Sequence, residues 1–329
     1  MTIQLSNLVN MGAIVPNAEE AYQLLHNLFD ALKIQENIAD LLSGDTAKII
    51  HVGVGDIVLQ FIEPLSNDGI WYKHLEIKGP GIHHLTFYVD NIKETIEILE
   101  KEAGITPFST INIDLEKIYP LDQVNEKAKK IYIMDTLGKF GFHLAFSEYP
   151  TKKELNLPKT KYPTGLDTLI GDASTMLHIE LTASDNDATY EILHNLFGTE
   201  KVEKEFSGIL DSDFMRIIHL NLSNVVLQYC QPVGKERTWY ELLQKNGPYV
   251  HNLNWCVSNI MRTVEKFKKE KVSMIFESWL SPDSPPFYMM DTLGVLGFHL
   301  EHGEAPKTKE GYEFVKNWFF TDFEMDYKE

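Results

Sequence analysis

The sequence predicts an α+β protein built from four βαβββ modules in two tandem halves. The first observation is an internal repeat, because adding 168 to a residue number between about 10 and 92 leads to its counterpart without a gap. The pentapeptide LHNLF at 25–29, for example, recurs at 193–197. Near the end of each half the offset becomes 156, so the first half carries twelve extra residues between Ile92 and Met134.

The second observation is the order in which strand-like and helix-like hydrophobic patterns follow one another within each half. Alternating or continuous apolar runs predict strands, and an apolar stripe at three- and four-residue spacing predicts a helix. The helix after the first strand begins at Asn17, a residue that caps helix N-termini. The expected order is a strand at 8–15, a helix after 17, a hairpin at 47–54 and 57–62, a strand at 82–89, a helix at 92–102, and strands at 130–134 and 140–146. The second half repeats this order over 176–302.

The composition is that of a globular protein with room for two cores. The chain has 329 residues, of which 43% are hydrophobic and 24% charged. No run of eighteen apolar residues occurs, and we expect no membrane partner. The net charge of −18 argues against nucleic acid as a partner, because both surfaces would be negative. The only cysteines are Cys230 and Cys256, and the N-terminus lacks a basic-then-apolar segment, so we expect a cytoplasmic protein.

Domain limits follow from the repeat and from the segment between its copies. We expect a first domain at 1–150, a proline- and lysine-rich linker at 151–172, and a second domain at 173–329. Apolar residues at helical spacing within 307–329 predict an appended C-terminal helix on the second domain.

Hairpin geometry places one polar pair in each half. A two-residue turn at Gly55-Asp56 sets His51 opposite Gln60, and the equivalent turn at 223–224 sets His219 opposite Gln228. Paired residues project from the same face of a sheet. His83 and His251 occupy the same position in the two copies of the repeat. Simple alternation along a strand turns both side chains to the opposite face, so we expect a structural role for them.

Three segments resemble one known superfamily. They are GIHHLTFYVDNI at 81–92, LHIELTASD at 177–185 and MDTLGVLGFHLE at 290–301. Their pattern is similar to the vicinal oxygen chelate superfamily, which includes glyoxalase, methylmalonyl-CoA epimerase, extradiol dioxygenases and bleomycin-resistance proteins. The resemblance implies two tandem domains with curved mixed sheets, in which paired modules close into a cup that holds a divalent metal and a small-molecule substrate. Such folds often form homodimers.

The resemblance also implies four ligand positions per domain, usually His, Gln, His and Glu. The first half offers Asn10, Gln60, His84 and Ala145, and the second offers His178, Gln228, Asn252 and Glu301. Amides are weak ligands for transition metals, so we expect no metal in the first half, which we interpret as a degenerate copy. In the second half we expect Mn, Fe, Co, Ni or Zn, anchored by His178 and Glu301 with Gln228 or His219 as the third ligand.

Other polar residues share the predicted inner face of the second half. Glu180, His219 and Glu301 are the candidates for proton transfer. Asn252, Asn254, His299 and Cys230 are expected to contact the substrate.

Together with these residues, the resemblance implies an enzyme, namely a metal-dependent isomerase, epimerase or lyase that acts on a small oxygenated molecule. Two other functions stay open: a non-catalytic protein that binds a small ligand, and an oxidoreductase of the extradiol dioxygenase type. Module pairing also stays open, because swapped modules would form a middle cup from His84, His178 and Gln228, whereas the uniform repeat offset favours pairing within halves.

Overall fold

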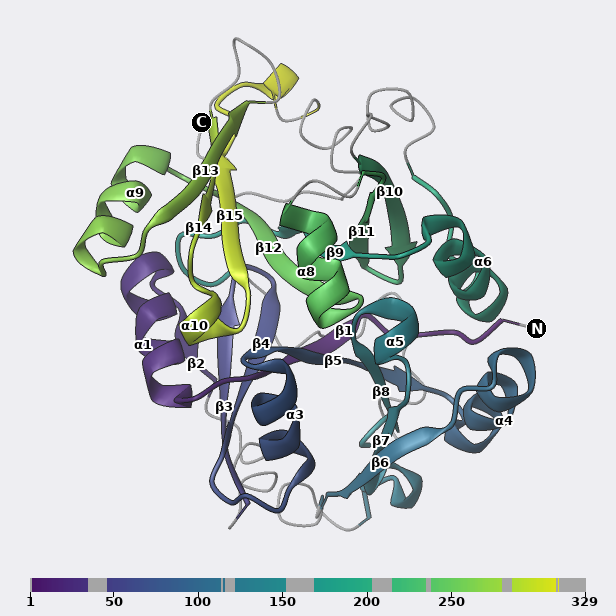
Figure 1. Cartoon of the computed structure of the whole chain (residues 1–329). Helices are drawn as coiled ribbons and strands as arrows, with labels where there is room; N and C mark the ends of the chain where they lie inside the picture. Colours follow the sequence, from purple (N-terminus) through teal and green to yellow (C-terminus); the bar gives the residue numbers. More distant parts are fainter. Residues whose placement is uncertain are drawn as a thin grey trace.

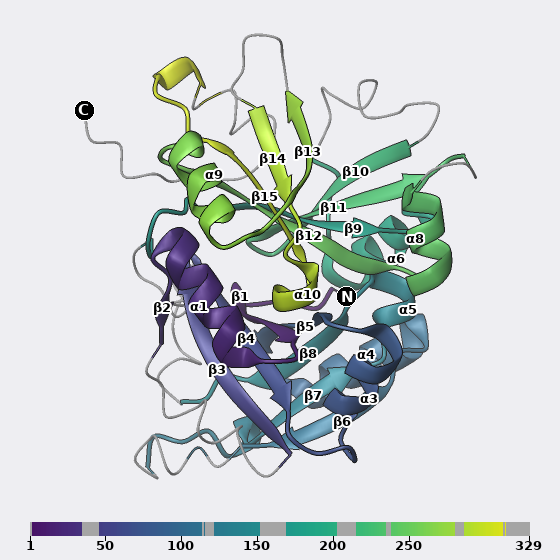
Figure 2. The ribbon, with the colours of Figure 1, turned by 60° about the vertical axis from the view of Figure 1, so that its left-hand side comes forward.

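Two mixed β-sheets, one from each half of the chain, form the framework of the protein (Figure 1). This computed structural model describes residues 2–34, 46–113, 115, 122–151, 169–202, 215–234, 238–279, 286–311 and 313. Figure 2 shows the later half of the chain lying above the earlier half. Within the described residues, no helix combines the length and the apolar character needed to cross a bilayer.

The first sheet has eight strands in the order β2-β3-β4-β1-β5-β8-β7-β6. Their bounds are β1 Leu8–Ile14, β2 Leu32–Lys33, β3 Ala47–Val54, β4 Ile57–Pro64, β5 Gly81–Val89, β6 Pro107–Asn112, β7 Lys130–Met134 and β8 His143–Glu148. The two modules meet where β1 runs antiparallel to β5, near the middle of the sheet.

The second sheet has seven strands in the order β10-β11-β9-β12-β15-β14-β13. Their bounds are β9 Met176–Thr182, β10 Met215–Leu222, β11 Val225–Pro232, β12 Tyr249–Val257, β13 Met274–Trp279, β14 Pro286–Met290 and β15 His299–Glu304. Again the modules meet at an antiparallel pair, β9 with β12.

Helices connect the strands, and asparagine or aspartate caps begin four of them. The described helices include α1 Ala18–Phe29, α3 Ile70–Lys78, α4 Ile92–Ala103, α5 Leu137–Phe140, α6 Asn186–Phe197, α8 Thr238–Asn246, α9 Ile260–Lys269 and α10 Leu293–Leu296. Asn17, Asn91, Asp185 and Asn259 each accept a backbone hydrogen bond from the first turn that follows. Such caps satisfy N–H groups that a helix leaves unpaired at its start.

The predicted fold class is confirmed, and each sheet takes its strands from one half only. Pairing within halves is therefore correct, and the swapped middle cup is wrong. The last strand of the first half begins at His143 and not at Phe140, because 137–140 form a helical turn that ends at Gly141 with φ 84°. The extra residues of the first half lie mainly in the connection between β6 and β7, at 113–129. The expected helix in 307–329 lies almost wholly outside the described residues.

One face of each sheet packs into a single core that continues from one half to the other. Helix α1 packs against α9, and α4 packs against α6, so the helices of the two halves interlock. Phe29 of α1 makes ring contacts with Trp255, Phe267 and His302 of the second half, at centroid distances of 6.5, 6.3 and 5.5 Å. We call the opposite face of each sheet its site face, because it carries the predicted ligand positions.

The hairpin turn of each half also holds the first strand of the other half. The Met176 N–H at the start of β9 donates to Asp56 Oδ1 at 2.8 Å. Its repeat counterpart, the Leu8 N–H at the start of β1, donates to Asn224 Oδ1 at 2.7 Å. The two halves thus clamp one another through equivalent side chains that differ only in charge.

Replacing Asp56 with asparagine should stabilise the protein at neutral pH. Burial raises the pKa of Asp56 from 3.8 to about 6, which means that the folded state disfavours the charged form. The penalty is present above pH 6 and fades as the pH falls toward 4. We expect Asp56→Asn to increase the free energy of unfolding by about 1–2 kcal/mol at pH 7 and by less at pH 5, measured by urea denaturation.

The reciprocal variant Asn224→Asp serves as the matched control and should destabilise the protein at pH 7. Equal stabilities of Asp56→Asn and the parent protein at both pH values would show that Asp56 carries no desolvation penalty.

Candidate functional site

The site face of the second sheet carries two rows of polar side chains. Strand register places His219, Gln228, Glu180, Asn252 and His299 side by side across five strands. The neighbouring row, two residues along the strands, joins His178, Asn254 and Glu301. The predicted site residues therefore lie on one face.

The predicted histidine–glutamine pairs are confirmed in both halves. His51 pairs with Gln60 and His219 with Gln228 in the hairpin register. The His219 Nε2 and Gln228 Oε1 atoms lie 2.8 Å apart, while in the first half the Gln60 Nε2 and His51 Nε2 atoms lie 2.9 Å apart. The two glutamines thus present opposite ends of their amides to the histidine.

Three potential ligand atoms converge in the second half. One donor atom from each of His178, Glu180 and Glu301 lies within 4.8 Å of the others, and within the described residues no other such group of His, Cys, Asp or Glu occurs. His178 is 2% exposed and Glu180 is 8% exposed, so the cluster is shielded from water. We call these three residues the acidic cluster.

The two carboxylates of this cluster have different partners. Glu301 Oε2 accepts hydrogen bonds from Asn252 Nδ2 at 3.0 Å and from Asn254 Nδ2 at 2.9 Å. Glu180 Oε1 lies 2.8 Å from His251 Nε2 and accepts from Cys230 Sγ at 3.2 Å. Neutral amides thus orient one acid, and an imidazole faces the other.

His251 does not face away from the site as simple alternation predicts. Val250 pairs with Leu181 and Asn252 pairs with Glu180, which leaves His251 as an extra residue in β12. Such a β-bulge interrupts the two-residue period and redirects side chains. The equivalent bulge in β5 occurs at His83. A bulge of this kind has no clear signature in the sequence, so the contact between His251 and Glu180 could not be foreseen.

Burial and like charge separate the acidities of the two carboxylates. Burial, together with the negative charge of Glu180, raises the pKa of Glu301. Burial also opposes the charge of Glu180, but electrostatic interaction and hydrogen bonding with the His251 ring outweigh it and lower the pKa of Glu180. Burial lowers the pKa of His178 to about 3, which keeps this imidazole neutral. A cation among the three residues would relieve the repulsion between the acids.

The remaining predicted residues take up positions around the cluster. Gln228 engages His219 with its oxygen and approaches Cys230 Sγ at 3.6 Å with its nitrogen, so its role as third ligand stays a prediction. Burial raises the pKa of the Cys230 thiol well above its usual value, which keeps the sulfur protonated. His299 lies 3.5 Å from Asp291 at the end of the row.

The equivalent face of the first sheet has no acid at these positions. Asn10, Gly12 and Ala145 occupy the positions of His178, Glu180 and Glu301. Burial and the charge of His143 lower the pKa of His84 to about 3. The two halves therefore differ as expected: the second site face has carboxylates at positions where the first has a glycine and an alanine.

Comparisons with known proteins agree with the predicted resemblance. Residues 10–111 match the model of the glyoxalase/bleomycin resistance protein/dioxygenase superfamily, which confirms the resemblance to the vicinal oxygen chelate superfamily. A search of curated protein sequences finds no significant match.

Solved structures extend the likeness of fold over nearly the whole chain. A triple mutant of 4-hydroxymandelate synthase from Streptomyces coelicolor superposes with a TM-score of 0.59 at 12% identity, covering 92% of this chain and 95% of that chain. BphC, a halotolerant catechol dioxygenase, superposes with a TM-score of 0.52 at 13% identity, covering 92% of this chain and 87% of that chain. At these identities the likeness establishes the tandem fold and no more.

The two carboxylates should respond differently to neutralisation in metal-free protein. Glu180→Gln removes the ionised acid that His251 and Cys230 contact, so we expect a loss of about 2 kcal/mol in the free energy of unfolding. Glu301→Gln keeps an oxygen for the two asparagines and removes an acid with a raised pKa, so we expect a change within about 1 kcal/mol. Urea denaturation at pH 7 with a chelator present measures both; equal losses would contradict the assigned roles.

Proposed function

We propose that the second domain is a metal-dependent enzyme site, at which an isomerase, epimerase or lyase acts on a small oxygenated substrate. The proposal rests on the acidic cluster, in which one imidazole nitrogen and two carboxylate oxygens lie within 4.8 Å of one another and are shielded from water. Glu180 replaces Gln228 as the third ligand in this proposal, since the oxygen of Gln228 is engaged by His219.

The residues present fit a divalent cation. Carboxylate oxygens with one imidazole suit Mn and are also compatible with Fe, Co, Ni or Zn. The asparagines that donate to Glu301 hold its carboxylate in place, as supporting residues commonly do around metal ligands. A bound cation would polarise a substrate oxygen and stabilise negative charge that develops on it.

The proton-transfer role in this proposal belongs to His219. Its ring centroid lies 6.1 Å from that of His178, and Gln228 fixes its orientation. Burial lowers the pKa of His219 to about 4, so the ring is uncharged at neutral pH, as a proton acceptor must be, and is a weaker base than a free imidazole. Cys230 is protonated and buried, which makes it a part of the wall and not a nucleophile.

Ring cleavage of the extradiol type has less support than isomerase or lyase chemistry. The catechol dioxygenase shares the fold of this chain, but a fold hosts many reactions. The resemblance implies a second imidazole at position 252, where this chain has Asn252. The cluster therefore offers one imidazole and two acids, in place of the two imidazoles and one acid that suit iron in oxygenases.

Metal analysis of the purified full chain tests the proposal. We expect about one Mn, Fe, Co, Ni or Zn ion per chain, measured by inductively coupled plasma mass spectrometry after dialysis. His178→Ala and Glu301→Ala should each reduce the content at least tenfold, because each removes one of three ligands.

The matched control is Asn10→Ala, at the first-half counterpart of His178, which should retain the metal. Purified protein that is metal-free, and that takes up none of these ions when they are added, would overturn the enzyme proposal. That result would favour the alternative of a non-catalytic binding protein. Retention of the ion by both ligand variants would place the metal elsewhere.

A further inference from the structure

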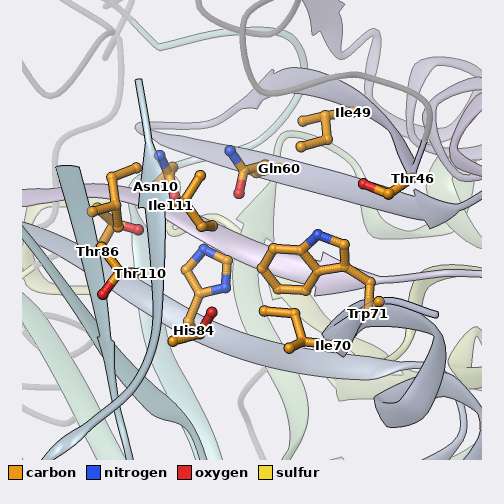
Figure 3. Close-up of a pocket in the computed structure, with 13 residues that line it drawn as sticks. Asn10, Thr46, Ile49, Gln60, Ile70, Trp71, His84, Thr86, Thr110 and Ile111 are labelled. Carbon is orange, nitrogen blue, oxygen red and sulfur yellow. The ribbon is translucent and has the colours of Figure 1, made fainter. Parts of the chain in front are cut away.

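The site face of the first sheet contains a cavity of about 260 Å³ (Figure 3). Strands β1, β4 and β5 supply its polar wall through Asn10, Gln60, His84 and Thr86, and helix α3 closes one side with Trp71. Its volume lies just below the usual range for ligand pockets, about 300–1,000 Å³. A cavity of this size fits a molecule with one ring or two fused rings.

Among the described residues, the lining of this cavity includes no carboxylate, lysine or arginine. A charged ligand would lose part of its hydration without gaining a counter-ion, which is unfavourable. The cavity therefore selects against ions. This contrasts with the acidic cluster at the equivalent place in the second sheet.

The polar wall offers hydrogen-bond acceptors to a ligand. Asn10 Oδ1 is buried and has no hydrogen-bond partner among the described residues. Gln60 donates its Nε2 to His51, which leaves its Oε1 as an acceptor, and Figure 3 shows that oxygen on the side of His84. A buried acceptor without a partner costs free energy that a ligand donor would recover. The missing partners are N–H or O–H groups.

The remaining lining combines the hydroxyl groups of Thr46, Ser109 and Thr110 with aromatic and aliphatic side chains. The rings of Trp71 and His84 lie 6.0 Å apart at an angle of 31°. Isoleucine side chains complete the lining, among them Ile49 and Ile111. Aromatic faces and branched aliphatic side chains favour a planar, apolar ring between them.

We propose that the first-domain cavity binds a small, uncharged aromatic or heteroaromatic molecule whose N–H or O–H donors meet Asn10 and Gln60, without a metal. The half that lost the ligand positions for a cation is thus a second, independent binding site. It does not depend on the enzyme function proposed for the second domain.

Three benzene derivatives of similar size separate the features of this site. Resorcinol has two hydroxyl donors, 1,3-dimethoxybenzene has none, and 3-hydroxybenzoate adds a negative charge. Titration calorimetry of the full chain with a chelator present should give a dissociation constant on the order of 0.1–1 mM for resorcinol. Binding of the other two should be at least tenfold weaker, since one lost hydrogen bond is worth about 1.4 kcal/mol.

Three variants test where resorcinol binds. Asn10→Leu removes an acceptor and should weaken resorcinol at least tenfold, and Ser109→Phe, on strand β6, should fill the cavity and abolish binding. His178→Leu, the equivalent change in the second sheet, should leave resorcinol binding unchanged. The inference is overturned if resorcinol does not bind, if 3-hydroxybenzoate binds as tightly, if both first-half variants bind like the parent, or if His178→Leu weakens binding equally.

Discussion

The structure depends on a reciprocal clamp between the two halves of the chain. Each hairpin turn binds the backbone that leads into the first strand of the other half, through Asp56 in one direction and Asn224 in the other. Two glycines with positive φ allow a second close approach, because a Cβ on Gly141 or Gly297 would press against the start of the opposite β12 or β5. The strands that carry the site residues are therefore positioned by the partner half. Neither site face is set by its own sheet alone.

On this shared framework, the two site faces differ in the size and the charge of their side chains at equivalent positions. A Cβ on Gly12 would overlap the imidazole of His84, so the large ring of the first half requires a glycine beside it. In the second half the same two positions are Glu180 and Asn252, where the smaller amide leaves room for an acid. The exchange removes one imidazole and adds one carboxylate. It changes the donor set without changing the register of the sheet.

A second exchange, at the last strand, completes the difference. Ala145 in β8 belongs to an apolar cluster with Ile14, Ile62 and Trp71, which forms the floor of the first site face. Glu301 at the equivalent place brings a carboxylate that two asparagines orient. One face thus became an uncharged cavity and the other a concentration of buried charge. The same fold accommodates both, since the opposite faces of the sheets share one unchanged core.

The sequence by itself determined the repeat, the order of strands and helices, the hairpin register and the asymmetry of the two site faces. The order of elements and the hairpin register depend on local periodicity and turn length, whereas the asymmetry was found at ligand positions that the family resemblance implies. The repeat offset favoured pairing within halves, and the sheets agree.

Only the tertiary structure decided that His251 contacts Glu180, that Glu180 joins His178 and Glu301, and that the first half encloses a cavity. Packing decides the one-residue bulge, the distance between strands of separate modules and the volume of the cavity. They depend on residues far apart in the chain, and no local pattern encodes them.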